Sequence, residues 1–388
     1  HTLVLYAAGR QVEDPTVSAT DIPATVEPDH AALAAVVARF PAVVRGGDLG
    51  VCRMSGGLIN DTFAVGARYV LQRLHPVFGA KVNLDIAALG QILRQRGVPV
   101  PAIERADDGA PWIEVADGPT RGVWRVLERL PGLSYAKVER PARAASGAAL
   151  VARFHGALAG VEHRFAFERP GAHDTALHIA KMHVALDAHR GHRLYEDVAA
   201  LCPRIDALWR VIGPAPALPR RIVHGDLKIS NLLFVGDEAV ALIDLDTMAW
   251  MGLDAELGDA LRSWCNLARE DELAAFDEGI FAAALHGYGA TAAIAGGGFA
   301  AAGVTDDERE AVVHGLLRIT LELSARFAGD ALAEAYFGWD PSRASGRGEH
   351  NFARAAGQLA LVDAVLARRS ALEAIARAAL APNAIRRR

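Results

Sequence analysis

The amino-acid sequence predicts an α+β fold of two lobes, a small antiparallel β lobe followed by a larger, mainly helical lobe. Short β-like runs separated by turn residues dominate the first third of the chain. Longer segments with apolar residues at helical spacing follow, and one further pair of β-like runs interrupts them near residues 221–243. With 388 residues, 52% of them hydrophobic, the chain is long enough to form two lobes.

The chain divides into three parts. Residues 1–28 are predicted to be an N-terminal extension, because residues 9–28 mix Asp, Glu, Pro, Thr and Ser. The N-terminal lobe covers residues 29–130 and opens with a helix over residues 30–40 that Asp29 can cap. The helical lobe covers residues 131–388.

The first lobe is predicted to contain a glycine turn between two strands, within residues 55–65. Gly56 and Gly57 in that turn would let backbone N–H groups approach phosphate oxygens, although a simple glycine hairpin is the alternative. Alternating and helical apolar patterns predict its remaining elements, which are strands over residues 68–74, 112–115 and 122–129 and a helix over residues 83–96.

A polar loop in the middle of the chain carries the strongest chemical signal. It reads H-G-D-x-K-x-x-N from His224 to Asn231, and a strand that follows a Gly-Asp turn ends on Asp244. Asp226, Asn231 and Asp244 can converge on one point, and such hard oxygen ligands suit Mg²⁺. Lys228 would leave an extended loop on the same side as Asp226.

These residue types match the needs of phosphoryl transfer. Asp226 would accept the proton of an attacking hydroxyl, Lys228 would neutralise the transferring phosphoryl group, and Asn231 and Asp244 would hold the metal. The alternative is a polar turn that only connects two strands. The full pattern, followed by I-D-x-D after a strand, is specific enough to favour phosphoryl transfer.

This stretch resembles the catalytic loop and metal strand of the protein-kinase-like phosphotransferases, where H-R-D-L-x-x-x-N and D-F-G play these parts. HGD in place of HRD is similar to the aminoglycoside phosphotransferase branch, which includes kinases for antibiotics, choline, homoserine and sugars. Further matches across residues 55–368 resemble the N-acetylhexosamine 1-kinases. They are Asn60-Asp61-Thr62, residues 68–73, His173-Asp174-Thr175, Gly258-Asp259, Glu322, Arg326-Phe327, Asp330, Tyr336-Phe337 and Glu349-His350-Asn351.

The resemblance implies a protein-kinase-like bilobal fold that binds ATP in the N-terminal lobe, near Asn60 and Thr62. Adenine would bond to the backbone of the hinge, in the segment from Glu128 to Leu130.

The third strand of the lobe departs from the kinase pattern, because it lacks the lysine that pairs with the α- and β-phosphates. Gln72 and Arg73 stand at that place, and strand alternation lets only one of them face the cleft. Arg73 is favoured for its charge, although Gln72 fits the kinase register better.

The resemblance also implies an acceptor site in the helical lobe. A helix cap is the alternative role for the His173-Asp174-Thr175 segment. Intrahelical ion pairs are the alternative role for Glu322, Arg326 and Asp330, which recur every four positions. Asp259 resembles a carboxylate that supports the catalytic loop. The predicted substrate residues are His173, Asp246, Glu322, Arg326, Asp330 and His350.

Three functions are compatible with these observations. The first is an ATP- and Mg²⁺-dependent kinase acting on the anomeric hydroxyl of an N-acetylhexosamine or related hexose. The second is a kinase for an aminoglycoside, homoserine or a choline-type amine, of which the aminoglycoside enzyme needs an acidic cleft. The third is a nucleotide-binding pseudokinase scaffold, which the missing lysine suggests and the intact Asp226, Asn231 and Asp244 disfavour.

Composition narrows the partners and the compartment. A formal net charge of −5 gives no attraction to nucleic acid or anionic membranes. No apolar run reaches the roughly 18 residues of a transmembrane helix, and the first residues lack a signal-peptide pattern. Three cysteines, an odd number, favour a reducing cytoplasm over a disulfide framework. The sequence sets neither the sugar nor the oligomeric state.

Overall fold

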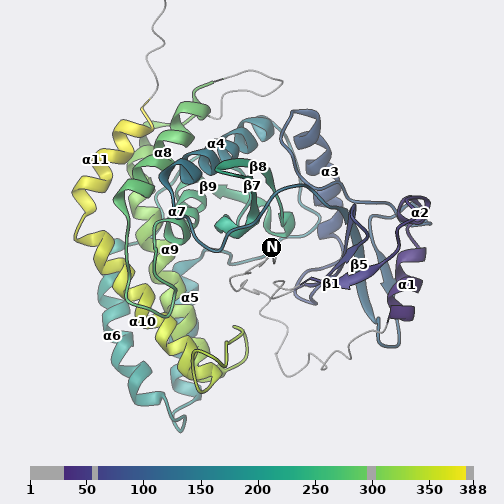
Figure 1. Cartoon of the computed structure of the whole chain (residues 1–388). Helices are drawn as coiled ribbons and strands as arrows, with labels where there is room; N and C mark the ends of the chain where they lie inside the picture. Colours follow the sequence, from purple (N-terminus) through teal and green to yellow (C-terminus); the bar gives the residue numbers. More distant parts are fainter. Residues whose placement is uncertain (1–29, 55–59, 295–302, 382–388) are drawn as a thin grey trace, which may run out of the picture.

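The protein has two lobes, as its computed structural model shows for residues 30–54, 60–294 and 303–381 (Figure 1). The N-terminal lobe contains a five-stranded sheet, and most of the chain after it is helical. This arrangement confirms the predicted α+β, protein-kinase-like fold.

The sheet of the N-terminal lobe has the strand order β1-β2-β3-β5-β4, and each neighbouring pair is antiparallel. The strands predicted over residues 68–74, 112–115 and 122–129 are confirmed. The predicted glycine turn, with Gly56 and Gly57, lies outside the described residues. The strands are β1 (Val51–Arg53), β2 (Asp61–Val65), β3 (Tyr69–Arg73), β4 (Ile113–Val115) and β5 (Gly122–Glu128).

The two faces of this sheet have different partners. One face packs Leu71 and Trp124 into an apolar cluster with α1 (His30–Ala38) and α2 (Pro41–Arg45). Neighbouring residues along a strand point to opposite faces. The pair Gln72 and Arg125, one position further along, therefore points away from α1. On that side lies α3 (Val82–Gln95), whose Asn83 accepts a hydrogen bond from Arg125.

The helical lobe is built around one long helix, α9 (Asp306–Ala333), which contacts five other helices of the lobe. The sequence predicts a helix cap and an acidic first turn at residues 305–308, and the helix begins there, where Thr305 and Glu308 form a capping box. The other helices are α4 (Pro141–Leu158), α5 (Thr175–Ala188), α6 (Tyr195–Ile212), α7 (Leu253–Trp264), α8 (Glu278–Ala292), α10 (Arg347–Leu366) and α11 (Arg369–Ala379).

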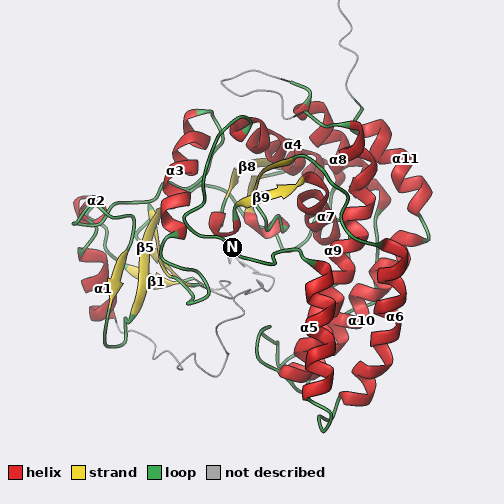
Figure 2. Cartoon of the chain, turned by 180° about the vertical axis from the view of Figure 1, so that it is seen from behind, coloured by secondary structure: helices red, strands yellow, loops and turns green. Residues whose placement is uncertain are grey.

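Two short strand pairs lie in the helical lobe, where Figure 2 shows them in yellow beside α4 and α7. The hairpin of β7 (Leu232–Val235) and β8 (Glu238–Leu242) turns at the predicted Gly-Asp pair. The second pair joins β6 (Arg220–Val223) to β9 (Ala249–Gly252), and β9 was not predicted because its four residues show no alternation. These pairings bring the polar loop after β6 close to the turn that follows β8.

The sequence pattern predicts that a helix starts at Gly258 and that His350 opens the final helix, and both of these boundaries are wrong. Helix α7 begins at Leu253 and not at Gly258, and His350 lies in α10 and not in the final helix, α11. Gly258 lies mid-helix because α7 crosses α9 there, and a Cβ on it would come within 2.6 Å of the main-chain carbon of Gly315. None of the helices in the described part of the chain combines the length and apolar character needed to cross a bilayer.

Candidate active site

A buried carboxylate of α7 holds the start of the polar loop between β6 and β7. The backbone N–H groups of His224 and Gly225 donate to the two oxygens of Glu256 at 2.8 and 2.9 Å. Burial favours the neutral form of Glu256, but hydrogen bonding and charge from His155 outweigh it and keep the pKa of this carboxyl below its usual range. Glu256 is therefore an ionised anchor for the start of the loop.

Gly225 can be replaced by no other residue without a shift of the chain. Its φ of 77° lies in the left-handed region, and a Cβ there would come within 2.3 Å of the carbonyl oxygen of Thr247. The hydroxyl of Thr247 donates to the carbonyl of His224 at 2.7 Å. The loop and the turn before β9 are thus packed against each other at the backbone.

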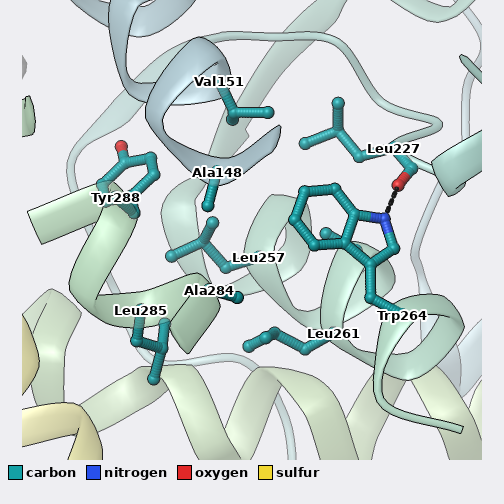
Figure 3. A pocket seen from close by; sticks show the side chains of 10 residues that line it. Ala148, Val151, Leu227, Leu257, Leu261, Trp264, Ala284, Leu285 and Tyr288 are labelled. Carbon is teal, nitrogen blue, oxygen red and sulfur yellow. Dashed lines mark hydrogen bonds between the residues drawn. The ribbon is translucent and has the colours of Figure 1, made fainter. Parts of the chain in front are cut away.

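A second anchor comes from the apolar interior under the loop. Figure 3 shows the indole of Trp264 directed at the carbonyl oxygen of Leu227, with a hydrogen bond of 2.7 Å. The surrounding cavity of about 10 Å³, between α4, α7 and α8, has room for about one water molecule. This space therefore belongs to the packing beneath the loop and is no ligand site.

The predicted catalytic residues come together on this loop. The ammonium nitrogen of Lys228 lies 3.5 Å from a carboxylate oxygen of Asp226. The side-chain nitrogen of Asn231 donates to the carbonyl of Asp226 at 2.8 Å, so its amide oxygen is the atom that can serve a metal. The side chain of Asp226 is 17% exposed, which leaves it within reach of a small acceptor.

The predicted metal ligand Asp244 is brought next to this loop by a backbone hydrogen bond. Ile243 donates its N–H to the carbonyl of Asn231 at 2.9 Å. Asp244 itself has a φ of 72°, a left-handed conformation that is rare for residues with a side chain and often marks functional sites. A carboxylate and an amide oxygen fit Mg²⁺, which completes its shell with phosphate oxygens and water.

Three of the predicted nucleotide residues of the first lobe form one hydrogen-bonded group. The amide of Gln72 donates to the hydroxyl of Thr62 at 3.3 Å, and that hydroxyl donates to the carbonyl of Asn60 at 3.1 Å. Asn60 donates in turn to Asp246 at 3.0 Å, across the boundary between the lobes.

Arg73 lies on the other face of the sheet. Its guanidinium donates to Asp61 at 2.7 Å and to the carbonyl of Pro119 at 3.1 Å, and it stacks over the ring of Trp124. Gln72, and not the favoured Arg73, is therefore the residue that faces the helical lobe.

The most buried cation of this region was not predicted. Arg125, which is 1% exposed, donates to both oxygens of Asp246 and to the side-chain oxygen of Gln72. Its only signal in the sequence was an arginine within the apolar strand sequence V-W-R-V-L. Glu256 was not predicted either, and its only signal was an acidic residue within a helical pattern.

The predicted hinge follows β5. Glu128 donates its N–H to the carbonyl of Ala102, and Leu133, three residues beyond Leu130, exchanges two backbone hydrogen bonds with Phe234 of β7. Extended backbone thus connects the lobes at this point, and the adenine contact of Glu128 and Leu130 stays a prediction.

A cleft of about 620 Å³ opens in the helical lobe beside β9. Its walls come from residues 165–173, β9, the start of α7 and Arg318 of α9. The start of the first wall is held by the N-terminal lobe, because Asp85 of α3 accepts the N–H groups of Ala166 and Phe167 at 2.9 and 3.0 Å. Strand β9 directly follows the turn packed on Gly225, so the cleft lies one strand away from the polar loop, which contributes no residue to its lining.

Two predicted substrate residues, His173 and Glu322, meet at the cleft. His173 lines it with a φ of 57°, and its ring lies 3.3 Å from Glu322, which also accepts a hydrogen bond from Thr175 at 2.7 Å. Burial would raise the pKa of Glu322, but hydrogen bonding and charge from His173 hold it at about 2. The cap of α5 is the neighbouring Asp174, which accepts from Leu177.

The remaining predicted residues have partners within the protein. Asp330 accepts three N–H groups of residues 335–337, and Arg326 donates to the hydroxyl of Tyr336. His350 lies 3.2 Å from Asp271. These contacts organise the chain after α9, and a substrate role for the three residues stays a prediction. Asp259 binds Arg262, while the loop is held by Glu256 and Trp264.

A comparison with protein families agrees with this geometry. The model of the phosphotransferase enzyme family named APH matches residues 50–294. The chain belongs to this family. It is thus an ATP-dependent phosphotransferase of the APH family, whose acceptor is a small molecule.

Solved structures of APH-family and related kinases have the same fold. An aminoglycoside phosphotransferase from Alicyclobacillus acidocaldarius is 16% identical, with a TM-score of 0.56 over 91% of this chain and 98% of that one. A choline/ethanolamine kinase family protein from Mesorhizobium loti is 19% identical, with a TM-score of 0.52 over 89% and 98%. A microcompartment-associated aminopropanol kinase is 14% identical, with a TM-score of 0.57 over 86% and 98%. Identities this low establish the fold and leave the acceptor open.

Proposed function

We propose that this APH-family protein is a Mg²⁺-dependent sugar kinase that phosphorylates the anomeric hydroxyl of an N-acetylhexosamine or a related hexose. The observation that carries the proposal is the position of Asp226, which lies beside Lys228 and Asn231 on an anchored loop, with an open cleft at the neighbouring strand β9.

The residues divide the chemistry among them. The carboxylate of Asp226 accepts the proton of the acceptor hydroxyl while that oxygen bonds to the γ-phosphorus of ATP and ADP departs. Lys228 offers a positive charge 3.5 Å from that carboxylate, where negative charge on the transferring group can be neutralised. Mg²⁺, held by Asn231 and Asp244, supplies further charge neutralisation when it is bound.

The charge of the cleft favours a neutral acceptor over a polycation. The charged side chains that line it are two carboxylates, Glu168 and Asp254, and three guanidiniums, Arg169, Arg220 and Arg318. Asp254 is already paired with Arg318 at 3.0 Å. An aminoglycoside needs an excess of acidic groups, which this lining does not have.

Aromatic side chains support a sugar acceptor in the same cleft. Phe165, Phe167 and Trp250 line it and offer flat apolar surfaces, while His173 supplies a polar group. The choice of an N-acetylhexosamine, and of its anomeric oxygen, rests on the resemblance to the 1-kinases described above.

The test is ADP release with ATP and Mg²⁺ across N-acetylglucosamine, N-acetylgalactosamine, glucosamine, galactose, homoserine, choline and kanamycin. We expect turnover on one hexosamine and none on its methyl glycoside, in which the anomeric oxygen is blocked. Turnover on kanamycin, homoserine or choline alone would contradict the sugar assignment. ATP binding without turnover on any acceptor would favour the scaffold.

A further inference from the structure

A buried ion pair joins the two lobes next to the metal-binding turn. The two terminal nitrogens of Arg125, on β5, lie 2.5 and 3.0 Å from the two oxygens of Asp246. Both side chains are almost fully enclosed, at 1% and 0% exposure. An arginine and a carboxylate that share two parallel hydrogen bonds have a fixed mutual orientation as well as a strong attraction.

Further contacts of this pair come from the nucleotide side of the first lobe. Arg125 also binds the side-chain oxygens of Gln72 on β3 and Asn83 on α3. Asp246 receives a further hydrogen bond from Asn60, whose own side-chain oxygen accepts the N–H of His75. Arg125 and Asn60 of the N-terminal lobe therefore both bind one carboxylate of the helical lobe, and Arg125 is itself held by two further residues of that lobe.

That carboxylate lies on the turn that carries the metal ligand. Asp246 follows Asp244 by two residues, within the tight 3₁₀ turn Leu245–Thr247, and Asp244 has a left-handed backbone. In a turn this short, fixing the side chain of Asp246 also fixes the direction in which Asp244 points. The other end of the turn is held by Thr247 on His224.

We propose that Arg125 and Asp246 are a positioning pair, which orients the metal ligand Asp244 toward the nucleotide bound in the N-terminal lobe. This inference rests on the proposed function, because it needs a nucleotide and a metal ion. The pair provides an ionic link between the nucleotide sheet and the metal turn in a chain whose third strand has Gln72 where kinases have lysine. Asp246, predicted above to bind substrate, acts here through Asp244.

Loss of the positioning pair should weaken the affinity for the metal ion. Residues that orient metal ligands change metal affinity about 10- to 100-fold when they are replaced. The effect of Arg125 and Asp246 should therefore appear in the part of nucleotide binding that depends on Mg²⁺. Binding of the metal-free nucleotide should stay close to wild type.

The experiment is calorimetric titration with the ATP analogue AMP-PNP, once in EDTA and once in excess Mg²⁺. The ratio of the two Kd values measures the gain that the metal provides, without any acceptor or turnover. We expect Arg125→Gln and Asp246→Asn each to lower this gain about 10- to 100-fold, with the Kd in EDTA little changed.

A single substitution leaves one buried charge without its partner and can prevent folding. The double variant Arg125→Gln/Asp246→Asn removes both charges and keeps side chains that can still hydrogen-bond, so it keeps the test decisive. The matched control is Arg318→Gln/Asp254→Asn, which neutralises another buried Arg–Asp pair, 4% exposed on both sides, at the acceptor cleft. It should leave the metal gain unchanged.

The outcomes separate this inference from the proposed function. A folded double variant with the full metal gain would overturn the positioning role. An Asp246→Asn protein with normal metal gain and a raised KM for the acceptor would instead make Asp246 a substrate residue. A wild-type protein that binds AMP-PNP no better with Mg²⁺ than in EDTA would overturn the proposed function, and the positioning role with it.

Discussion

Trp264 donates its indole N–H to the main-chain carbonyl of Leu227 at 2.7 Å, and Leu227 stands between the proposed catalytic residues Asp226 and Lys228. The loop that carries them is thereby bonded to the apolar interior of the helical lobe. A carbonyl fixed in this way limits the rotation of both flanking peptide units.

Replacing Trp264 with Phe should therefore affect catalysis and stability together. The variant loses one buried hydrogen bond, worth about 1 kcal/mol, and some packing volume. We expect a lower urea midpoint and a lower kcat with little change in the KM for ATP. The control is Trp339→Phe at a site 37% exposed, which should leave both quantities at the wild-type level.

The role of Asp226 predicts the behaviour of Asp226→Asn. Loss of a general base costs about 10²- to 10⁴-fold in turnover, and the amide keeps the size of the side chain. Initial rates should fall by this factor while the calorimetric Kd for AMP-PNP with Mg²⁺ stays close to wild type. Asp187→Asn, at a side chain 72% exposed, serves as the control. Full turnover by Asp226→Asn would remove the mechanism proposed here.

Gly225 offers a test that separates backbone strain from steric collision. Gly225→Ala meets both a positive φ of 77° and the carbonyl of Thr247 at 2.3 Å, whereas Gly213→Ala meets a φ of 76° and nothing within 4 Å. The strain alone costs about 1–3 kcal/mol. We expect thermal unfolding to show this loss for Gly213→Ala and a clearly larger one for Gly225→Ala. Equal losses would mean that the loop and the turn can move apart.

Glu322 predicts a pH dependence of stability. Its pKa of about 2 in the folded protein lies below the ordinary value of 4.5, so ionised Glu322 stabilises the fold above pH 4.5. This contribution, on the order of 3 kcal/mol, is lost as the pH falls from about 4.5 to about 2. The difference in unfolding free energy between wild type and Glu322→Gln should shrink from pH 7 to pH 3. A constant difference would contradict the ion pair with His173.

The fold and the centre of the site were predictable because their signals are local. Asp226, Lys228 and Asn231 lie within six residues, and the hairpin that leads to Asp244 has its own turn residues. Local spacing alone could place these residues together. The missed features join distant parts of the chain: Arg125 and Asp246 are 121 residues apart, and Glu256 is 32 residues from His224.

Strand alternation showed that Gln72 and Arg73 must face opposite ways, but not which face packs on α1 and α2. That choice depends on the apolar cluster around Trp124, whose residues come from α1, α2 and the strands β2 to β5. The start of α7 was misplaced for a related reason. Gly258 resembles a helix boundary in sequence, and only the approach of α9 explains why a glycine is needed mid-helix.

The hold of Asp85 on the backbone of Ala166 and Phe167 has a kinetic consequence. Helix α3 belongs to the nucleotide lobe and, through Asp85, also holds one wall of the acceptor cleft. Any tilt of that lobe upon ATP binding therefore reshapes the cleft. The two substrates should then assist each other's binding. Initial-rate plots should intersect, with the KM for the acceptor falling as ATP approaches saturation, and severing this tether with Asp85→Ala should make the two substrates bind independently.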